Sequence, residues 1–421
     1  MSPSQGSGRV HVVGAGLAGL SAAVGLAAKG AQVEVSEAAG QAGGRCRSYF
    51  DSQLGLTIDN GNHLVMSGNP AVMRYLAAIG ASGRLAGPDT SEFNFVDLTT
   101  GERWVLRPND GPLPWWIFSP RRRAPGTRVA DYLGLGGLMF AKPDQRVDQV
   151  VKTEGVVWDR LLHPFLLAAL NTEPKGGSAY LGGAVVKETL AKGGQAFRLR
   201  FAEPTLAAAF IEPAIKTLEA RPGATVRLGR RLRGLGFDGD RVSELAFGDQ
   251  TTAVAPEDRV ILAVPPWIAQ SLIPGLSAPD VFCSIVNCHF RMAPPAGTPT
   301  ITAVLGGTAE WVLAYPDRVS VTVSGADAIV DEDRESLIGR IWADVCAVLG
   351  LAGDPPAWQI VKERRATFAA TPEQNAKRPP ARTAWSNLYL AGDWTDTGLP
   401  ATIEGALRSG ETAAALALER L

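Results

Sequence analysis

The pattern of hydrophobic positions is clearest at the start of the chain. Residues 9–13 (Arg-Val-His-Val-Val) look like a short buried strand, and residues 32–36 (Gln-Val-Glu-Val-Ser) look like a second strand. The Ala- and Leu-rich stretch between them predicts a helix that ends near Lys29, with Gly30 as its stop signal. Strand, helix and strand in this order predict a βαβ unit that opens a parallel sheet.

The rest of the chain mixes helical and strand patterns. Between about 81 and 204 the pattern is mostly irregular, with clusters of proline, glycine and aromatic residues. The Asp-Glu-Asp sequence at 331–333 suits the positive N-terminal end of a helix. Helices are expected over 71–80, 155–170, 204–220, 331–349 and 400–420. Strands are expected over 224–228, 231–237, 241–247, 259–264, 300–305, 310–314, 319–324 and 388–391.

The turn between the first strand and the first helix carries a glycine fingerprint. Its glycines have the spacing G-x-G-x-x-G, and an acidic residue ends the next strand. Such glycines allow a tight turn and the close approach of a pyrophosphate to the helix N-terminus. The alternative is a glycine-rich turn that binds nothing. The residues predicted to bind a dinucleotide are Gly14, Ala15, Gly16, Leu17, Ala18 and Gly19, with Glu37 accepting hydrogen bonds from the adenosine ribose.

A second segment, Gly43-Gly44-Arg45, favours FAD over NAD as the dinucleotide. The glycine pair allows contact between backbone and cofactor, and Arg45 can neutralise pyrophosphate charge. The alternative is a surface loop with a solvated arginine.

A third segment lies at the other end of the chain. Gly392 and Asp393 follow a buried strand, and Thr402 and Ile403 begin the last helix. Asp393 can bind a ribityl hydroxyl, and the helix start suits the N1/O2 edge of a reduced, anionic flavin. Alone this would be an ordinary helix cap. Together with the fingerprint, it predicts that both ends of the chain meet around one FAD.

Composition narrows the class of function. The chain has 421 residues, enough for two domains, and a formal net charge of -1, which gives no electrostatic case for nucleic-acid binding. Its four cysteines contain no C-x-x-C pair, so a reducing, cytoplasmic compartment is expected. Cys283, Cys288 and His289 lie close in sequence but lack a second ligand pair, so no metal site is expected. No apolar run approaches the ~20 residues of a membrane-spanning helix.

An aromatic and basic segment at 115–123 has two interpretations. Trp115-Trp116-Ile117-Phe118 precedes Arg121-Arg122-Arg123, which suits peripheral contact with the inner face of a membrane. The alternative is a set of core aromatics beside a solvated loop.

Blocks of the sequence resemble known flavoproteins. The fingerprint, Gly43-Gly44-Arg45, the strand ending in Pro265-Pro266 and the terminal Ala-Gly-Asp resemble the monoamine oxidase and phytoene desaturase superfamily over the whole chain. Residues 59–69, 162–174 and 397–410 look like the hydroxysqualene dehydroxylase family, the squalene-associated FAD-dependent desaturases.

This resemblance implies an α/β fold with two domains. A Rossmann-like FAD-binding domain would be assembled from residues 1–75, 205–275 and 382–421. A discontinuous, mixed α+β substrate domain would use residues 76–204 and 276–381. The resemblance also implies an adenine contact by the backbone of Leu232. Covalent members carry a cysteine in the C-terminal flavin segment, but residues 392–406 contain none, so the FAD is expected to be non-covalent.

The narrower resemblance implies an FAD-dependent oxidoreductase of hopanoid biosynthesis. It would replace the allylic hydroxyl of hydroxysqualene, a long apolar isoprenoid, by hydride to give squalene. An acid must protonate the leaving oxygen, and hydride comes from N5 of reduced flavin. The candidate acids are His63 first, because it follows Asn-Gly-Asn in a loop, and then Glu173, Asp396 and Glu404.

Other functions stay open. His63 is alternatively a structural histidine, and Glu404 a helix cap. The same fold would serve an FAD-dependent desaturase or an amine oxidase, and a non-catalytic flavin-binding protein is a third reading.

Overall fold

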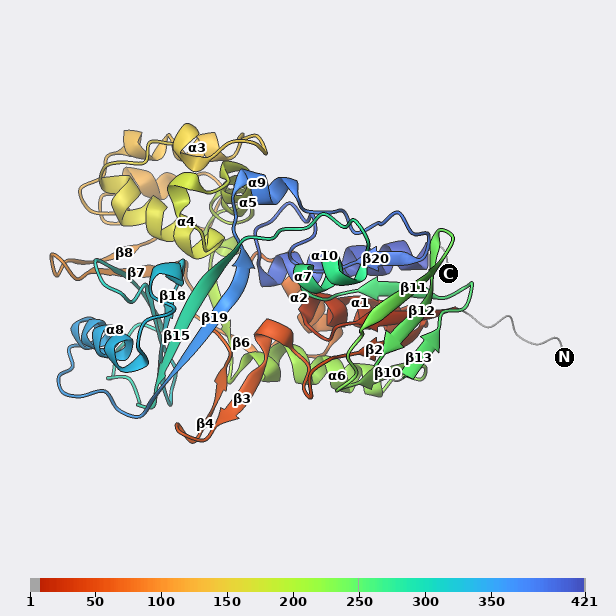
Figure 1. Ribbon diagram of the computed structural model, residues 1–421. Coiled ribbons are helices and arrows are strands. Elements are labelled where there is room, and N and C mark those ends of the chain that lie inside the picture. Colours follow the sequence, from red (N-terminus) through yellow and green to blue (C-terminus); the bar gives the residue numbers. More distant parts are fainter. Residues whose placement is uncertain (1–7, 249, 420–421) are drawn as a thin grey trace.

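A five-stranded parallel sheet lies at the centre of one part of the molecule (Figure 1). The computed structural model describes residues 8–248 and 250–419. All neighbouring strands of this sheet pair in parallel, and their side chains are mostly apolar and buried, as in other parallel sheets with both faces covered. In spatial order the strands are β10 (Ala224–Arg227), β2 (Gln32–Ser36), β1 (Arg9–Val13), β14 (Arg259–Leu262) and β20 (Leu388–Leu390).

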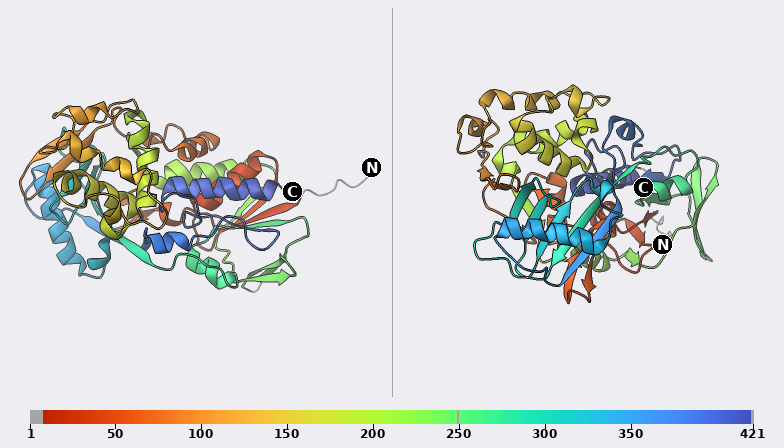
Figure 2. Two further views of the ribbon diagram at one scale, coloured as in Figure 1. Left: turned by 90° about the horizontal axis from the view of Figure 1, so that it is seen from above. Right: turned by 60° about the vertical axis from the view of Figure 1, so that its left-hand side comes forward.

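Helices cover one face of this sheet. The first helix, α1 (Leu17–Ala28), packs along the last, α10 (Ile403–Leu418), as Figure 2 shows. The Ser21 hydroxyl on α1 donates a hydrogen bond to the Leu407 carbonyl oxygen on α10 at 2.9 Å. Two further helices complete this layer, α2 (Pro70–Ala78) against α10 and α6 (Glu212–Glu219) against α1.

An antiparallel sheet covers the opposite face. Apolar side chains of β14 and β20 share a core with it. Its strands are β11 (Gly234–Asp238), β12 (Arg241–Phe247) and β13 (Gln250–Ala253).

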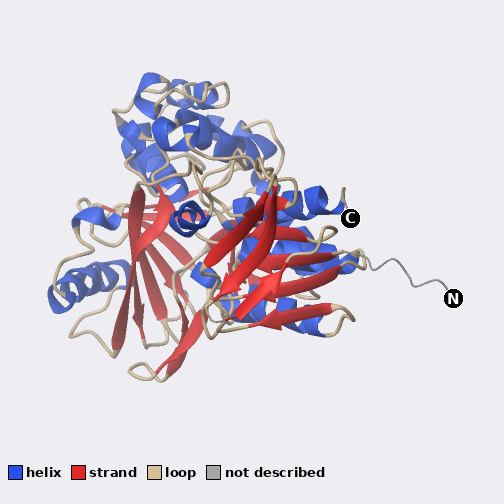
Figure 3. Ribbon diagram, turned by 45° about the vertical axis from the view of Figure 1, so that its right-hand side comes forward, coloured by secondary structure: helices blue, strands red, loops and turns tan. Residues whose placement is uncertain are grey.

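The second part of the molecule is built on a mixed seven-stranded sheet (Figure 3). Helix α8 (Arg334–Leu349) packs on its outer face through an apolar core. In spatial order the strands are β19 (Trp358–Phe368), β15 (Phe282–Phe290), β18 (Val319–Val323), β17 (Trp311–Ala314), β16 (Ile301–Leu305), β7 (Phe93–Asp97) and β8 (Arg103–Leu106).

Short elements connect and cap these sheets. The helices are α3 (Leu135–Leu138), α4 (His163–Leu170), α5 (Ala179–Glu188), α7 (Pro266–Leu272) and α9 (Pro372–Ala376). The small sheets consist of β3 (Ser48–Asp51) with β4 (Leu56–Asp59), and of β5 (Leu64–Met66), β9 (Leu199–Ala202) and β6 (Leu85–Ala86).

The structure corrects several expected elements. The helix expected over 331–349 begins at Arg334, because Asp333 is its N-cap and accepts a hydrogen bond from the Ser336 N–H at 2.9 Å. The strand expected over 231–237 begins only at Gly234. Strands β7 and β8 lie in the stretch that looked irregular, β15 lies within residues 280–330, where further strands were expected, and β19 was not expected.

Candidate active site

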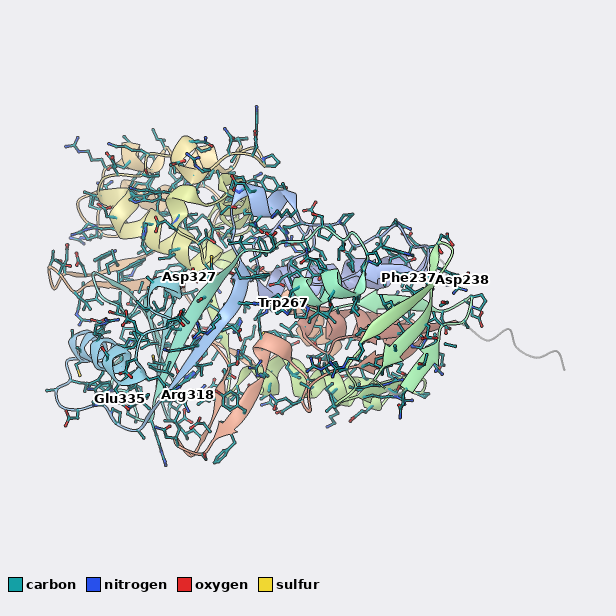
Figure 4. All side chains as sticks on the ribbon, in the orientation of Figure 1. Phe237, Asp238, Trp267, Arg318, Asp327 and Glu335 are labelled. Atoms are coloured by element: carbon teal, nitrogen blue, oxygen red, sulfur yellow. The ribbon has the colours of Figure 1, made fainter. Side chains whose placement is uncertain are left out.

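One continuous cavity of about 910 Å³ joins the glycine fingerprint to a chamber with apolar walls. It reaches Gly14 and Gly16 at one end and Phe93 and Phe165 at the other. Trp267, which Figure 4 shows between the two parts of the molecule, also lines it. A ligand that fills this cavity therefore contacts both parts.

The fingerprint glycines have three different structural roles. Gly14 has a φ of +107°, and a Cβ there would lie 2.3 Å from the Ala263 carbonyl oxygen. A Cβ at Gly19 would lie 1.9 Å from the Gly14 carbonyl oxygen, so this glycine permits the tight contact between turn and helix. At Gly16 a Cβ would meet nothing within 4 Å. Gly16 therefore leaves open the space through which a pyrophosphate would approach the backbone.

The N-terminus of α1 is free to receive an anion. No side chain caps it, and its first turn contains no acidic residue. Leu17 and Ala18 line the cavity, but Ala15 and Gly19, which were also predicted to bind the dinucleotide, do not. The Ala15 N–H instead donates to Glu37 Oε2 at 2.8 Å.

The far end of the dinucleotide region contains Glu37 and Leu232, which both line the cavity. Glu37 is held by the N–H groups of Ala15 and Ala39, each at 2.8 Å, so its carboxylate is fixed in place. Leu232 is buried beside Arg230, whose guanidinium stacks 3.9 Å from the ring of Phe247 and pairs with Glu34. These positions suit the roles predicted for the ribose and the adenine.

The N- and C-terminal motifs meet through an ion pair. Arg45 Nη2 donates to Asp393 Oδ1 at 2.6 Å, and Arg45 Nη1 donates to the Ala366 carbonyl oxygen at 2.5 Å. Burial lowers the pKa of Arg45, but the charge of Asp393 and the hydrogen bond to it, together with smaller contributions from Cys46 and Glu363, outweigh this and raise the pKa. Gly43 and Gly44 both have positive φ, and a Cβ at Gly44 would lie 3.5 Å from the Gly16 Cα.

The start of α10 closes the same region. Thr402 is its N-cap and accepts a hydrogen bond from the Gly405 N–H at 3.0 Å. Thr402, Ile403, Gly392 and Asp393 line the cavity. The open helix terminus, the space at Gly16 and the joined motifs fit an elongated dinucleotide such as FAD.

The opposite end of the cavity is an apolar chamber. The rings of Phe93 and Phe197 lie 4.4 Å apart, and Phe165 meets Phe197 edge-on at 5.9 Å. Trp267 contacts Phe282 edge-on at 5.0 Å. Aliphatic side chains complete the wall, namely Leu106, Leu161, Leu199 and Leu313. Such a lining favours a long hydrocarbon.

Of the four predicted proton donors, His63 has an accessible ring nitrogen in the cavity. Its Nδ1 lies 3.0 Å from the Gly61 carbonyl oxygen, so Nδ1 carries a proton and Nε2 has no partner among the described residues. Burial lowers the pKa of His63, and Arg45 lowers it further, while Asp393 and Glu363 oppose this.

The other three predicted donors are placed differently, although Glu404 also lines the cavity. Glu404 is 3% exposed and accepts hydrogen bonds from the Ala71 N–H (3.1 Å) and the Val72 N–H (3.0 Å), so it caps α2 and not its own helix. Glu173 has a side chain that is 66% exposed, and it does not line the cavity. Asp396 is also exposed and outside the lining.

Several polar residues of the cavity had no predicted role. Asn60, Asn62, Asn287 and Glu363 all line it. Asn287 interrupts an otherwise mostly apolar, buried strand, which is a signal that sequence reasoning could have used. Glu363 lies in a run of charged residues typical of a solvated surface, so the sequence around it does not indicate that it lines a cavity.

Two remaining expectations concern metals and membranes. Among residues 8–248 and 250–419, no group of three His, Cys, Asp or Glu side chains is arranged to hold a metal ion. Within the same described residues, no helix has the length and apolar character needed to cross a bilayer.

Comparisons with known proteins support a flavin cofactor. The family model of flavin-containing amine oxidoreductases matches residues 17–418. The chain is 53% identical over 410 residues to hydroxysqualene dehydroxylase of Rhodopseudomonas palustris, which covers 97% of this chain and 98% of that protein. It is 54% identical over 409 residues to hydroxysqualene dehydroxylase of Sinorhizobium fredii, with the same coverage.

Solved structures share the fold at low identity. Cyclohexylamine oxidase from Brevibacterium oxydans has a TM-score of 0.71 at 15% identity, covering 98% of this chain and 99% of that one. A putrescine oxidase variant redesigned for cofactor binding has a TM-score of 0.72 at 18% identity, with the same coverage. The predicted α/β fold class is therefore confirmed.

Proposed function

Because this chain belongs to the flavin-containing amine oxidoreductase family, we propose that it replaces the allylic hydroxyl of hydroxysqualene by hydride. The products are squalene and water. The reaction consumes one hydride and one proton, and FAD in its reduced form supplies the hydride. A separate two-electron donor must reduce the FAD again after each turnover.

The observation that carries this proposal is the continuous cavity. Its dinucleotide end and its apolar end belong to one space, so a long isoprenoid can reach the flavin end without crossing water. The aromatic and aliphatic walls exclude water from the reacting carbon. Exclusion matters because water would capture an allylic cation and regenerate the alcohol.

We propose His63 as the proton donor for the leaving oxygen. Burial and the charge of Arg45 make the protonated imidazole a stronger acid than a solvated histidine, although the Gly61 carbonyl and the carboxylates of Asp393 and Glu363 partly stabilise it. The rate should therefore rise as the pH falls through and below 6.5, the ordinary pKa of histidine. A His63→Gln enzyme should lose this dependence while it keeps FAD. A variant that retained the wild-type pH profile would exclude His63.

The reaction itself can be tested in a single turnover. The FAD-loaded enzyme is reduced photochemically without oxygen and mixed with hydroxysqualene. We expect reoxidation of the flavin absorbance band and one squalene per flavin. If the oxidised enzyme is instead reduced by an amine or by a carotenoid precursor, it is an oxidase or a desaturase. If nothing exchanges electrons with the flavin, the chain binds FAD without this chemistry.

Two expectations accompany this proposal and stay predictions. The first is the division into an FAD-binding domain (residues 1–75, 205–275 and 382–421) and a substrate domain (76–204 and 276–381). The second is non-covalent FAD, and acid precipitation of the holoenzyme should release all of its flavin into the supernatant.

We also propose that the segment 115–123 touches a membrane surface. Trp116 and Ile117 are buried in the apolar core that includes the chamber residues Phe93 and Phe197, whereas Trp115 and Phe118 are 65% and 60% exposed. Two exposed aromatic rings beside residues that share a core with the chamber support this proposal, because such rings suit a membrane interface from which an isoprenoid would enter.

Neighbouring residues extend this surface. Leu133 and Phe140, which flank α3 at the top of Figure 1, are 73% and 84% exposed. Arg121 and Arg122 are exposed as well and suit anionic headgroups.

Vesicle co-sedimentation tests the membrane proposal. A W115S/F118S double variant should lose binding to anionic vesicles. Phe50→Ser is the matched control, because Phe50 is 67% exposed but lies on the β3–β4 hairpin at the bottom of Figure 1. Equal binding by the wild type and the double variant would contradict the proposal.

A further inference from the structure

Asn287 lies in the middle of β15, on the cavity wall, and is only 2% exposed. Its Oδ1 accepts three hydrogen bonds. The Asn62 N–H donates at 3.1 Å, Asn62 Nδ2 at 3.4 Å and Thr322 Oγ1 at 3.0 Å. The side-chain amide is therefore held firmly through its oxygen.

These contacts fix which end of the amide faces the cavity. A backbone N–H can only donate, so the atom opposite the Asn62 N–H must be the oxygen of Asn287. The nitrogen, Nδ2, then points away from this network. It has no hydrogen-bond partner among the described residues. It lies beside Gly61, where a Cβ would be 3.1 Å from it.

Because Nδ2 has no partner among the described residues and is not fully buried, it is open to the cavity, where a ligand atom can accept its hydrogen bond. The ligand must present an acceptor at a point otherwise surrounded by a hydrocarbon chamber. A Cβ at Gly61 would also lie 3.6 Å from His63 Cε1. The Asn287 amide and the His63 imidazole therefore border the same small volume.

We propose that Asn287 Nδ2 binds the hydroxyl oxygen of the substrate and orients it as the leaving group. This assignment rests on the proposed function, since it takes the substrate to be an isoprenoid alcohol. The oxygen accepts the amide N–H while a proton from His63 reaches its other lone pair. The C–O bond then breaks and the oxygen leaves as water. The amide does not titrate, so it holds the oxygen before and after protonation.

Asn62 and Thr322 act through Asn287. Thr322 Oγ1 also accepts from Asn62 Nδ2 at 3.0 Å, which closes a small ring of hydrogen bonds around the Asn287 oxygen. These two are positioning residues, and they explain why the amide cannot rotate to present its oxygen to the cavity.

The test uses equilibrium binding to the oxidised holoenzyme, which cannot transfer hydride. Dissociation constants for hydroxysqualene and for squalene are measured from the perturbation of the flavin absorbance. One hydrogen bond to a buried donor predicts that the wild type prefers the alcohol by about tenfold. Asn287→Leu, of similar size, should bind squalene as the wild type does and lose this preference.

A positioning variant and a matched control sharpen the result. Thr322→Val should lower the preference only partly, because the Asn62 backbone N–H still holds the amide. The control is Asn94→Leu, since Asn94 lies in β7 of the same sheet but does not line the cavity as Phe93 and Phe95 do. It should keep the full preference.

Three outcomes would overturn the assignment. They are a wild type that binds both lipids equally, an Asn287→Leu holoenzyme that keeps the preference, and an Asn94→Leu holoenzyme that loses it as fully as Asn287→Leu does. Failure of the proposed function would give a different result from failure of this assignment. The wild type would still prefer the alcohol through Asn287, but the reduced wild type would convert no hydroxysqualene.

Discussion

Gly16 offers a sharp test of where the dinucleotide lies. In a Gly16→Ala variant the added methyl group meets no protein atom within 4 Å, and the backbone at this position has φ -75° and ψ 178°, which alanine adopts freely. The free energy of unfolding of the apoprotein should therefore change by less than about 0.5 kcal/mol. The methyl group occupies the space of the approaching pyrophosphate. Overpacking of this kind costs about 1–3 kcal/mol, which raises the dissociation constant of FAD by about 5- to 150-fold.

Two other glycines of the same turn and helix provide the comparison. At Gly19 the methyl group would lie 1.9 Å from the Gly14 carbonyl oxygen and 3.2 Å from the Ala263 Cβ, so Gly19→Ala must push α1 away from the turn and destabilise the apoprotein. Gly25 is exposed in the middle of α1, and its nearest neighbour would be the Ala414 Cβ at 3.9 Å. Gly25→Ala should stabilise the protein by about 0.5–1 kcal/mol.

The assay combines flavin-fluorescence titration with thermal unfolding of the apoprotein. We expect weak FAD binding with normal apoprotein stability for Gly16→Ala, low stability for Gly19→Ala, and normal binding with raised stability for Gly25→Ala. If Gly16→Ala bound FAD with wild-type affinity, no pyrophosphate would pass this glycine and the reasoning about the site would be wrong.

Further predictions concern groups away from the fingerprint. Burial raises the pKa of Glu310 from 4.5 to about 7, so the folded state holds its proton more tightly and stability is lost as the pH rises between these values. The loss amounts to roughly 3 kcal/mol. Glu310→Gln should abolish it in urea unfolding curves, and a wild-type slope in the variant would contradict this. Burial also raises the pKa of Cys46 to about 12, so the native enzyme should resist alkylation of this thiol at neutral pH, as peptide mapping would show. Gly183→Ala would place a methyl group 1.9 Å from the Leu138 carbonyl oxygen and force α5 from α3. It should lower the free energy of unfolding by at least about 1–3 kcal/mol, and an unchanged melting temperature would refute that contact.

The sequence by itself determined the dinucleotide site because its signals are local. A buried strand, three glycines at fixed spacing and a helix must form a turn with an open helix N-terminus, whatever surrounds them. The C-terminal flavin motif was recognisable in the same way, because Gly392 and Asp393 closely follow a buried strand. The close ion pair between Arg45 and Asp393 is what joins these two local motifs.

Only the tertiary structure decided which polar residues line the cavity. The run that contains Glu363 looks solvated, but it forms the edge strand β19 of a sheet whose strands cross the cavity wall. Glu404 looked like a possible acid. Both of its carboxylate oxygens instead accept hydrogen bonds from backbone N–H groups at the N-terminus of α2, which is far away in the sequence. The free nitrogen of Asn287 exists because Asn62 and Thr322 hold its oxygen. Contacts between residues far apart in the sequence leave no periodic trace in it, so chemistry that depends on them becomes visible only when the chain is folded.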